Sequence, residues 1–255
     1  MTNPSDDAID RLRADRERGA SALAKDAVEI LAAAPAADRP ALAERLAALR
    51  LSMPAIAAIA REAARLRDPR DLLIEIETEH ERVAEDAAAL VAGAASVATI
   101  SNSSLVERVL GRARPDHTVV GVHGSTDEGH QLVARLKDAG LDALAVPMGA
   151  LDADLAVVGC DAIFDDGGFV NRSGTAELVA RFAGRPVIVM GDRWRRVAGP
   201  TPAVWSEPEL FEPVSAARNV CVVDGREPGK GRPDLPESQT EALKNRDTGD
   251  PNFPA

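Results

Sequence analysis

The residues best suited to chemistry gather in one stretch, residues 159–175, which read GCDAIFDDGGFVNRSGT. Asp161 follows the apolar run VVGC, so we expect it at or near the end of a buried strand. Partial burial at such a position favours the neutral form of a carboxyl group, which makes it a usable acid near neutral pH. A strand-end aspartate that only caps a loop fits the same pattern, and the residues leave both interpretations open.

The second part of this stretch is suited to holding an anion. Residues 165–168 (DDGG) predict a turn, and glycines there let the backbone approach a ligand closely. Residues 171–175 (NRSGT) then open a helix whose N-terminus can hold a phosphate, with Arg172 as an anion partner. In the alternative interpretation, Asn171 and Arg172 are ordinary helix-entry residues and Ser173 is the cap.

The elements that position these residues begin with a helical segment. Residues 7–92 are rich in Ala, Leu, Arg and Glu, and their apolar residues recur at helical spacing. This pattern predicts a helical domain over residues 1–92, although helices that serve only to pack or to oligomerise would show it too. The expected helices span residues 12–31, 41–49, 54–66 and 72–91.

Short apolar strands that alternate with helices follow, which predicts an α/β domain with a parallel sheet over residues 93–225. Ligands gather at the carboxyl ends of such strands, where SNSS (101–104) offers hydroxyls and backbone N–H groups to an anion. Residues 226–255 contain five prolines and few large apolar side chains, so we expect a disordered tail. The expected strands are residues 97–100, 118–122, 141–147, 155–164, 186–190 and 219–224.

Composition excludes several classes of function. The formal charge is −11, only 3% of residues are aromatic and none is tyrosine, so we expect no nucleic-acid partner. No apolar run reaches the ~18 residues of a membrane span, and the polar, acidic start MTNPSDDAID is unlike a signal peptide, so a cytoplasmic protein is expected. Cys160 and Cys221 belong to no CxxC pair and the histidines lack ligand spacing, so we expect no metal and no cofactor. Both cysteines are interpreted as structural.

The segment VGCDAIFDDGGFVNRSGTAELVA also resembles a motif of a known family, GAD-x(5)-G-x(2)-N-K-x-G-T. That family comprises the alpha, beta and delta subunits of translation initiation factor 2B, methylthioribose-1-phosphate isomerase and ribose-1,5-bisphosphate isomerase. All but the last thirty residues fall within the resemblance. Its other parts are DRERGASALAKDAVEIL (15–31), RLSMPAIAAI (50–59), TISNSSLV (99–106) and EGHQLVARLKDAG (128–140).

The resemblance implies an N-terminal helical bundle followed by a Rossmann-like parallel-sheet domain, and pairing of that domain into a homodimer. In the isomerases of the family, a cysteine and the aspartate of the motif share the proton transfers between an aldose phosphate and a ketose phosphate. The aspartate maps to Asp161, and the Asn-Lys pair that holds the substrate maps to Asn171 and Arg172.

The chain departs from the isomerase pattern at several positions. Ser101 stands where the isomerases have their cysteine, and a serine hydroxyl without a dedicated base is a far weaker acid than a thiol. Residues 122–125 (VHGS) replace Glu-Ser-Arg-Pro, and Glu128 and His130 stand in place of the glutamine and arginine of Gln-Gly-Arg. Several acid–base residues of the isomerase pattern are therefore replaced, while the loops that face an anion remain.

We therefore expect a regulatory or non-catalytic protein that binds a phosphorylated sugar or nucleotide. Two alternatives stay open: an aldose–ketose isomerase of a ribose phosphate, and a purely structural subunit of an assembly. The candidate catalytic residues are Asp161 and Ser101, and the candidate ligand contacts are Asn102, Ser103, Ser104, Asn171, Arg172, Gly174 and Thr175.

Overall fold

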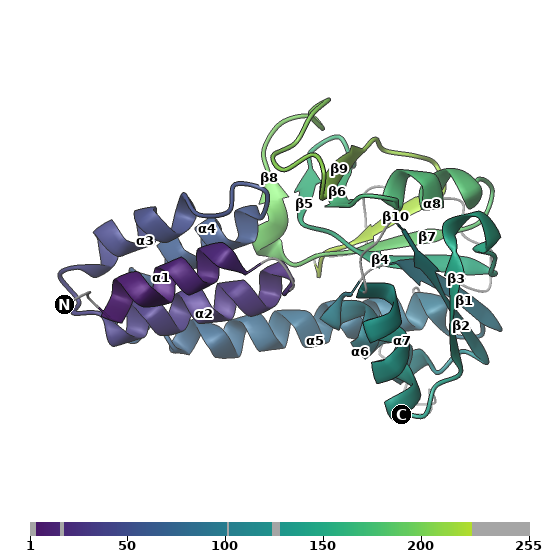
Figure 1. Cartoon of the computed structure of the whole chain (residues 1–255), viewed down its shortest axis with the longest axis horizontal. Helices are drawn as coiled ribbons and strands as arrows, with labels where there is room; N and C mark the ends of the chain where they lie inside the picture. Colours follow the sequence, from purple (N-terminus) through teal and green to yellow (C-terminus); the bar gives the residue numbers. More distant parts are fainter. Residues whose placement is uncertain (1–3, 16–17, 101, 124–127, 226–255) are drawn as a thin grey trace, which may run out of the picture. The chain divides into compact units, whose positions relative to one another are not determined.

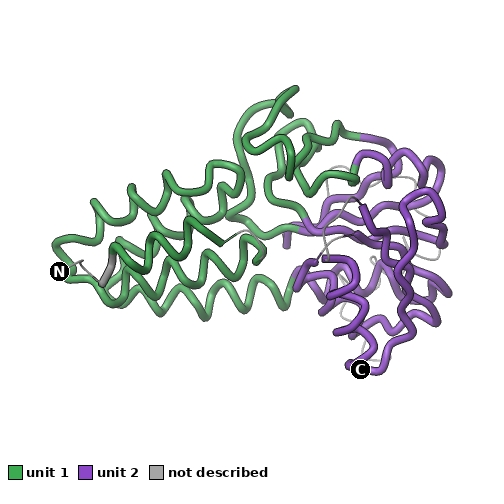
Figure 2. The backbone as a smooth tube through the Cα atoms, in the orientation of Figure 1, with its two compact units in different colours: residues 1–82, 160–175, 191–216 green, residues 83–159, 176–190, 217–255 purple. Residues whose placement is uncertain are grey.

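The computed structural model describes residues 4–15, 18–100, 102–123 and 128–225. The chain divides into two compact units, each built from separate stretches of sequence (Figure 2). Unit 1 comprises residues 1–82, 160–175 and 191–216, and unit 2 comprises residues 83–159, 176–190 and 217–255. The tail expected at residues 226–255 and the candidate residue Ser101 lie outside the described residues.

Unit 1 begins with helices that lie side by side (Figure 1). Helix α5 belongs to unit 1 as far as Arg82 and to unit 2 beyond it. The apolar side chains of these helices form a buried core with fully enclosed Leu23, Leu46 and Ile56. The helices are α1 (Pro4–Ala14), α2 (Ala20–Ala33), α3 (Arg39–Ala47), α4 (Pro54–Ala63) and α5 (Asp71–Val91).

The single helix predicted over residues 12–31 is in fact parts of two helices, α1 and α2. Apolar spacing could not show the break, because Leu12 and Leu23 on either side of it are both buried in the same core. The chain leaves α1 after Ala14, and α2 starts after Gly19, whose extended backbone forms the N-cap. The other three predicted helices are confirmed with boundaries shifted by a few residues.

Unit 1 also contains a small sheet in the order β8-β5-β6-β9. Strands β5 and β6 form an antiparallel pair joined by the predicted DDGG turn, and β9 pairs antiparallel with β6. The buried side chains Phe164, Val170 and Phe211 belong to the same apolar core as the helices. The strands are β5 (Ala162–Phe164), β6 (Phe169–Arg172), β8 (Arg196–Val197) and β9 (Phe211–Val214).

One prediction and one alternative interpretation in this region were wrong. Residues 155–164 are not one strand: β4 (Leu155–Gly159) lies in the large sheet of unit 2, and β5 lies in the small sheet of unit 1. Asn171 and Arg172 are not helix-entry residues but the end of β6, where they pair with Glu212 and Phe211 of β9. Helix α8 (Thr175–Arg181) begins only after them.

The described residues of unit 2 form a six-stranded sheet in which every neighbouring pair is parallel. The strand order is β10-β7-β4-β1-β2-β3, so successive strands are added on one side of β1 and then on the other. This confirms the predicted α/β class, with helices first and a parallel sheet after them. The strands not yet given are β1 (Ser96–Ile100), β2 (His117–Val122), β3 (Ala143–Pro147), β7 (Val187–Met190) and β10 (Val220–Val223).

One face of this sheet carries Val97, Val157 and Ile188, which are fully buried. They share a core with α6 (Ser104–Ala113), α7 (Glu128–Asp138) and the second part of α5, and Figure 1 shows α6 and α7 beside β1 and β2. Where strands are buried to this extent, apolar residues run continuously along them rather than alternating with polar residues, as expected for a parallel sheet. Within the described residues, no helix combines the length and apolar character that a membrane crossing needs.

Gly191, which directly follows β7, supports a test of the packing in unit 1. A Cβ at this position would lie 2.7 Å from Cys160 Sγ and 2.8 Å from Ile163 Cδ1, so Gly191→Ala overpacks the core. We expect a loss of about 1–3 kcal/mol in the free energy of unfolding, measured by urea denaturation. Gly111→Ala is the matched control, because no described atom lies within 4 Å of its Cβ, and in helix α6 it should gain about 0.5–1 kcal/mol. Equal stability of the two variants would contradict this packing.

Candidate functional site

The strand order of unit 2 reverses between β1 and β4, which places a switch point at the carboxyl ends of these two strands. In open α/β sheets, ligands bind in the crevice at such a point. The chain leaves β1 toward α6, and it leaves β4 after Gly159. A Cβ on Gly159 would lie 2.8 Å from Ser103 Oγ, so a residue without a side chain is needed for the start of α6 to approach the end of β4.

Helix α6 starts at this switch point and presents its positive end there. Ser103 is the N-cap: its backbone is extended, and its Oγ accepts a hydrogen bond from Val106 N at 3.4 Å. Ser104 is the first helical residue and is exposed. The N-terminus of a helix carries a partial positive charge and N–H groups directed outward, which together favour an anion.

Asn102 is held in place by helix α7 rather than left to solvent. Its Oδ1 accepts a hydrogen bond from Arg135 Nη2, and its Nδ2 lies 3.4 Å from Gln131 Oε1. Arg135 is in turn fixed by Glu107 of α6, with 2.8 Å between Nε and Oε2. The three predicted contacts Asn102, Ser103 and Ser104 are therefore consecutive residues at the start of α6, where side chains of α6 and α7 hold Asn102 in place.

In unit 1, Asp161 follows the point where the chain leaves β4. Its side chain is 9% exposed, which confirms the burial expected from the sequence. Its backbone N–H donates to Val170 O at 2.7 Å, and the carbonyl of the preceding residue, Cys160, accepts from Arg195 Nε at 2.8 Å. Both polar groups of the peptide before Asp161 are thus hydrogen-bonded.

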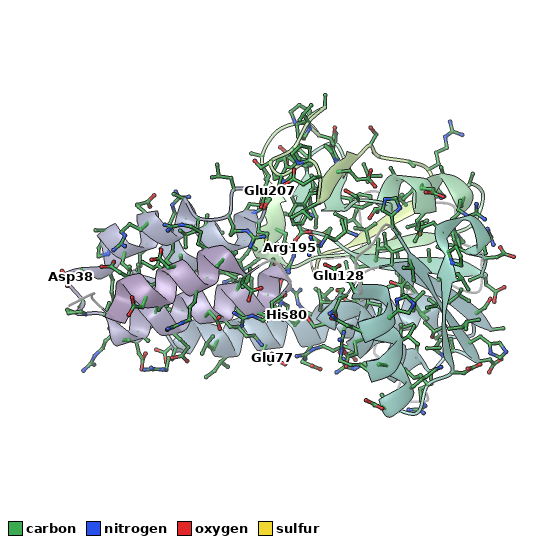
Figure 3. All side chains as sticks on the ribbon, viewed as in Figure 1. Asp38, Glu77, His80, Glu128, Arg195 and Glu207 are labelled. Atoms are coloured by element: carbon green, nitrogen blue, oxygen red, sulfur yellow. The ribbon has the colours of Figure 1, made fainter. Side chains whose placement is uncertain are left out.

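A buried ionic cluster in unit 1 was not predicted. Arg195 and Asp192 form an ion pair through Nη1 and Oδ2, and they are 5% and 1% exposed. His80 Nε2 of α5 lies 3.0 Å from the same Asp192 oxygen, and Figure 3 labels His80 and Arg195. The signal in the sequence is an aspartate directly after a buried strand, the same signal that identified Asp161.

The predicted contacts of the NRSGT segment form one turn between β6 and α8. Asn171 Nδ2 donates to Thr175 Oγ1 at 3.0 Å, and Thr175 Oγ1 donates to Arg172 O at 2.6 Å. Gly174 has φ of +97°, a left-handed conformation that favours glycine. The guanidinium of Arg172 lies 5.0 Å from the centre of the Phe211 ring, which supports it by a cation–π contact.

Asp165 and Asp166 lie in the turn, as predicted, and they hold a second loop. Asp165 Oδ2 accepts from Gly199 N at 2.8 Å. Asp166 accepts from Thr201 Oγ1 at 2.7 Å, from Thr201 N at 2.9 Å and from Gly168 N at 3.1 Å. The Thr201 hydroxyl is the main reason why the pKa of Asp166 lies below its ordinary value, and the two backbone N–H groups add to it.

Two arginines of the matching segments in unit 1, Arg18 and Arg50, have internal partners. Hydrogen bonds to Asp26 and then to Asp15 raise the pKa of Arg18 above its ordinary value. Arg50 is 3% exposed, and its Nε lies 3.6 Å from Glu207 Oε2, which also accepts a hydrogen bond from Ser52 Oγ. Glu207 has φ of +56°, an uncommon conformation for a residue with a side chain.

The described residues contain no group of three or more His, Cys, Asp or Glu side chains placed to hold a metal ion. Cys160 and Cys221 form no disulfide bond, and both are buried, at 5% and 6% exposure. Cys160 Sγ packs toward Gly191, where an added Cβ would lie 2.7 Å away. These environments agree with two structural cysteines.

Comparison with known proteins identifies a family and solved structures to which this chain is similar. The family model described as the Initiation factor 2 subunit family matches residues 16–193. No curated protein sequence matches the chain. Among solved structures, the translation initiation factor eIF-2B of Pyrococcus horikoshii OT3 is similar, with a TM-score of 0.75, 20% sequence identity, and coverage of 88% of this chain and 96% of that one.

Two further solved structures share the fold. A chain of the tetrameric eIF2B-beta2-delta2 complex of C. thermophilum has a TM-score of 0.68, 16% identity, and coverage of 94% of this chain and 93% of its own. The 5-methylthioribose 1-phosphate isomerase of Pyrococcus horikoshii OT3 has a TM-score of 0.64, 16% identity, and coverage of 94% and 88%. Because translation factors and an isomerase share one fold, the fold does not choose between them.

The contacts of Asp166 predict a pH-dependent effect of Thr201→Val, which removes the main hydrogen bond to the carboxylate. The pKa of Asp166 should rise toward its ordinary value of about 3.9, as measured by NMR titration. Because the pKa is lower in the folded state than in the unfolded state, the bond stabilises the fold above about pH 4, and this stabilisation is lost as the pH falls through the folded pKa. The stability advantage of the wild type over Thr201→Val should therefore shrink in acid.

Thr118→Val is the matched control for that experiment. The buried Thr118 Oγ1 has no hydrogen-bond partner among the described residues, so losing it should be neutral or stabilising at every pH. A Thr201→Val deficit of the same size at about pH 2.5 and pH 7 would contradict the role given to Asp166.

The buried pair of Arg195 and Asp192 predicts a large effect of Asp192→Asn. The substitution keeps the shape but leaves the buried guanidinium without its counter-charge, so we expect a loss of about 3–5 kcal/mol in urea denaturation. Asp152→Asn is the control, because Asp152 also pairs with an arginine, Arg185, yet its side chain is 80% exposed and the change should have little effect. Comparable losses in both variants would show that burial does not govern the effect.

Proposed function

Because the chain belongs to the Initiation factor 2 subunit family, we propose that it binds a phosphorylated sugar or nucleotide and acts as a regulatory, non-catalytic protein. The observation that carries this proposal is the capped start of α6 at the β1/β4 switch point, which Gly159 allows to approach the end of β4. A helix N-terminus at the carboxyl edge of a parallel sheet is suited to a phosphate group.

Two sets of residues are proposed as ligand contacts, and each is ordered within its own unit. In unit 2, the set is Asn102, Ser103 and Ser104, supported by the bonds from α6 and α7. In unit 1, the set is Asn171, Arg172, Gly174 and Thr175, in which Arg172 supplies a positive charge. Side chains held in this way lose little conformational entropy when a ligand arrives.

The non-catalytic part of the proposal rests on the residue types. Ser101 stands where the isomerases of this family have a thiol, and residues 102–104 at the start of α6 are an asparagine and two serines, none of which ionises near neutral pH. The chain thus keeps groups suited to an anion, and Ser101 is too weak an acid to accompany Asp161.

We propose in addition that the protein is a cytoplasmic homodimer. The similarity to a chain of a tetrameric eIF2B complex supports assembly with further subunits. A single species of monomer mass in light scattering at micromolar concentration would contradict the dimer.

A specific observation favours a second candidate function, the isomerisation of a ribose phosphate. Asp161 is 9% exposed, and both polar groups of the peptide before it are hydrogen-bonded, which restrains the position that a general acid or base needs to keep. If this function is correct, turnover of methylthioribose-1-phosphate or ribose-1,5-bisphosphate should be measurable and should disappear in Asp161→Asn. Undiminished turnover in that variant would exclude Asp161 as the acid or base.

The main proposal is tested by thermal-shift titration with ribose-1,5-bisphosphate, methylthioribose-1-phosphate, AMP and GDP. A ligand at one hundred times its dissociation constant adds about 2.7 kcal/mol to the stability, which is an easily measured shift. We expect at least one of these ligands to stabilise the protein and Arg172→Ala to weaken its binding by roughly tenfold or more, the loss of one charged hydrogen bond.

Arg193→Ala is the matched control for Arg172→Ala. Both arginines lie in unit 1 and stack on an aromatic ring, but Arg193 pairs with Glu62 and Glu75 and belongs to neither proposed set of contacts. Asn171→Ala is a less direct test, because Asn171 is only 5% exposed and also holds the turn. The proposal fails if none of the four ligands binds, or if Arg172→Ala binds as tightly as Arg193→Ala.

A further inference from the structure

Arg195 uses all three of its guanidinium nitrogens inside unit 1. Nε donates to Cys160 O at 2.8 Å, Nη1 pairs with Asp192 Oδ2, and Nη2 donates to Ser21 Oγ at 2.8 Å. The residue is 5% exposed, so these bonds form in a region of low dielectric where each is strengthened. The planar, charged fork of an arginine can meet three acceptors at once, which a lysine ammonium on a flexible stem does not reproduce.

The bond to Cys160 O has a particular consequence because it fixes the peptide that precedes Asp161. The other polar group of that peptide, Asp161 N–H, donates to Val170 O at 2.7 Å. The peptide plane is therefore held from both sides, by Arg195 on one side and by β6 on the other. Fixing this plane fixes the position of the Asp161 Cα, the atom from which its side chain leaves the backbone.

We propose that Arg195 is a positioning residue for Asp161: through the Cys160 carbonyl, it sets where the Asp161 carboxylate is presented to a ligand. This inference rests on the second candidate function, in assuming that Asp161 acts on a bound ligand. It assigns no contact between Arg195 and the ligand. The effect passes through the main chain.

The surroundings of Arg195 hold it in one orientation. Asp192 is 1% exposed, and its second oxygen accepts a hydrogen bond from Trp194 N at 3.1 Å, so the carboxylate cannot rotate freely. His80, 2% exposed, lies 3.0 Å from the same oxygen that pairs with Arg195. An added Cβ on Gly191 would come within 3.2 Å of Arg195 Cδ, so the aliphatic part of the side chain is also packed closely.

A purely structural role is the alternative to positioning. In that case, Arg195 would only tie Ser21 of α2 to the η2 turn (Arg193–Arg195), and its loss would loosen unit 1 as a whole. The two roles differ in where the loosening occurs. A positioning role predicts that loss of Arg195 loosens only the Cys160–Asp161 peptide. A purely structural role predicts that it loosens every strand of the small sheet.

The test measures amide hydrogen exchange in the Arg195→Lys variant by NMR, with the full chain and without ligand. The variant keeps a positive charge opposite Asp192 but loses the Nε donor. We expect the amide of Asp161 to exchange about tenfold faster or more, as local opening follows the loss of a charge-assisted bond. The amide of Phe164, which donates to Gly168 O at 2.9 Å in the same small sheet, should change less than about twofold.

Arg193→Lys is the matched control, since it lies in the same turn and keeps its charge beside Glu62 and Glu75. It should leave both amides unchanged. The proposal is overturned if Asp161 and Phe164 accelerate equally in Arg195→Lys, or if Asp161 does not accelerate. If Arg195→Lys does not fold, Ser21→Ala is used instead. It removes the Nη2 bond but keeps the Nε bond to Cys160 O, so positioning predicts no change at Asp161 or Phe164, and faster exchange of both amides would overturn it.

Ligand binding adds an independent measurement. In a double-mutant cycle with any ligand that binds the wild type, Arg195→Lys should weaken binding, but it should weaken it no further in the Asp161→Asn background. Additive effects would overturn positioning through Asp161. If none of the phosphorylated ligands binds the wild type, the proposed function fails, while the amide exchange still decides the role of Arg195.

Discussion

The buried ion pair between Arg195 and Asp192 is the interaction on which the rest of unit 1 depends. A charged residue that is less than about a tenth exposed is tolerated only when a counter-charge and hydrogen bonds compensate its charge. The segments that supply these partners must therefore stay together. They come from α2 through Ser21, from α5 through His80, and from the residue after β4 through the Cys160 carbonyl. The small sheet and the helical bundle of unit 1 are joined at this cluster as well as through their shared apolar core.

Unit 2 depends on a different constraint, the space available at the reversal of its strand order. The connections that leave the carboxyl ends of β1 and β4 diverge there, and the start of α6 fits beside β4 because residue 159 has no side chain. Asn102, Arg135 and Glu107 then tie the loop to α6 and α7. The result is a preorganised helix N-terminus at the edge where parallel sheets bind ligands.

Much of this architecture could be predicted from the sequence, and the failures have physical reasons. Strands β1, β2 and β7 were predicted because short apolar runs between turn residues are typical of buried strands. The break inside residues 155–164 was missed because both halves are buried, so hydrophobicity continues while the chain passes from one sheet to another. In the site, too, local features were predicted and long-range contacts were not. The turn from Asn171 to Thr175 is local and was found, whereas His80 and Asp192 meet across 112 residues, a separation over which spacing carries no information.

Binding of a phosphorylated ligand at the carboxyl edge of the large sheet, as proposed above, can be tested by amide chemical-shift mapping with NMR. Ribose-1,5-bisphosphate would be titrated into ¹⁵N-labelled protein. If the ligand binds there, the largest chemical-shift changes should fall on Ser104 and Leu105 at the start of α6 and on Gly159 at the end of β4. Shifts confined to α1–α4, or to residues at the opposite ends of the strands such as His117, would contradict it.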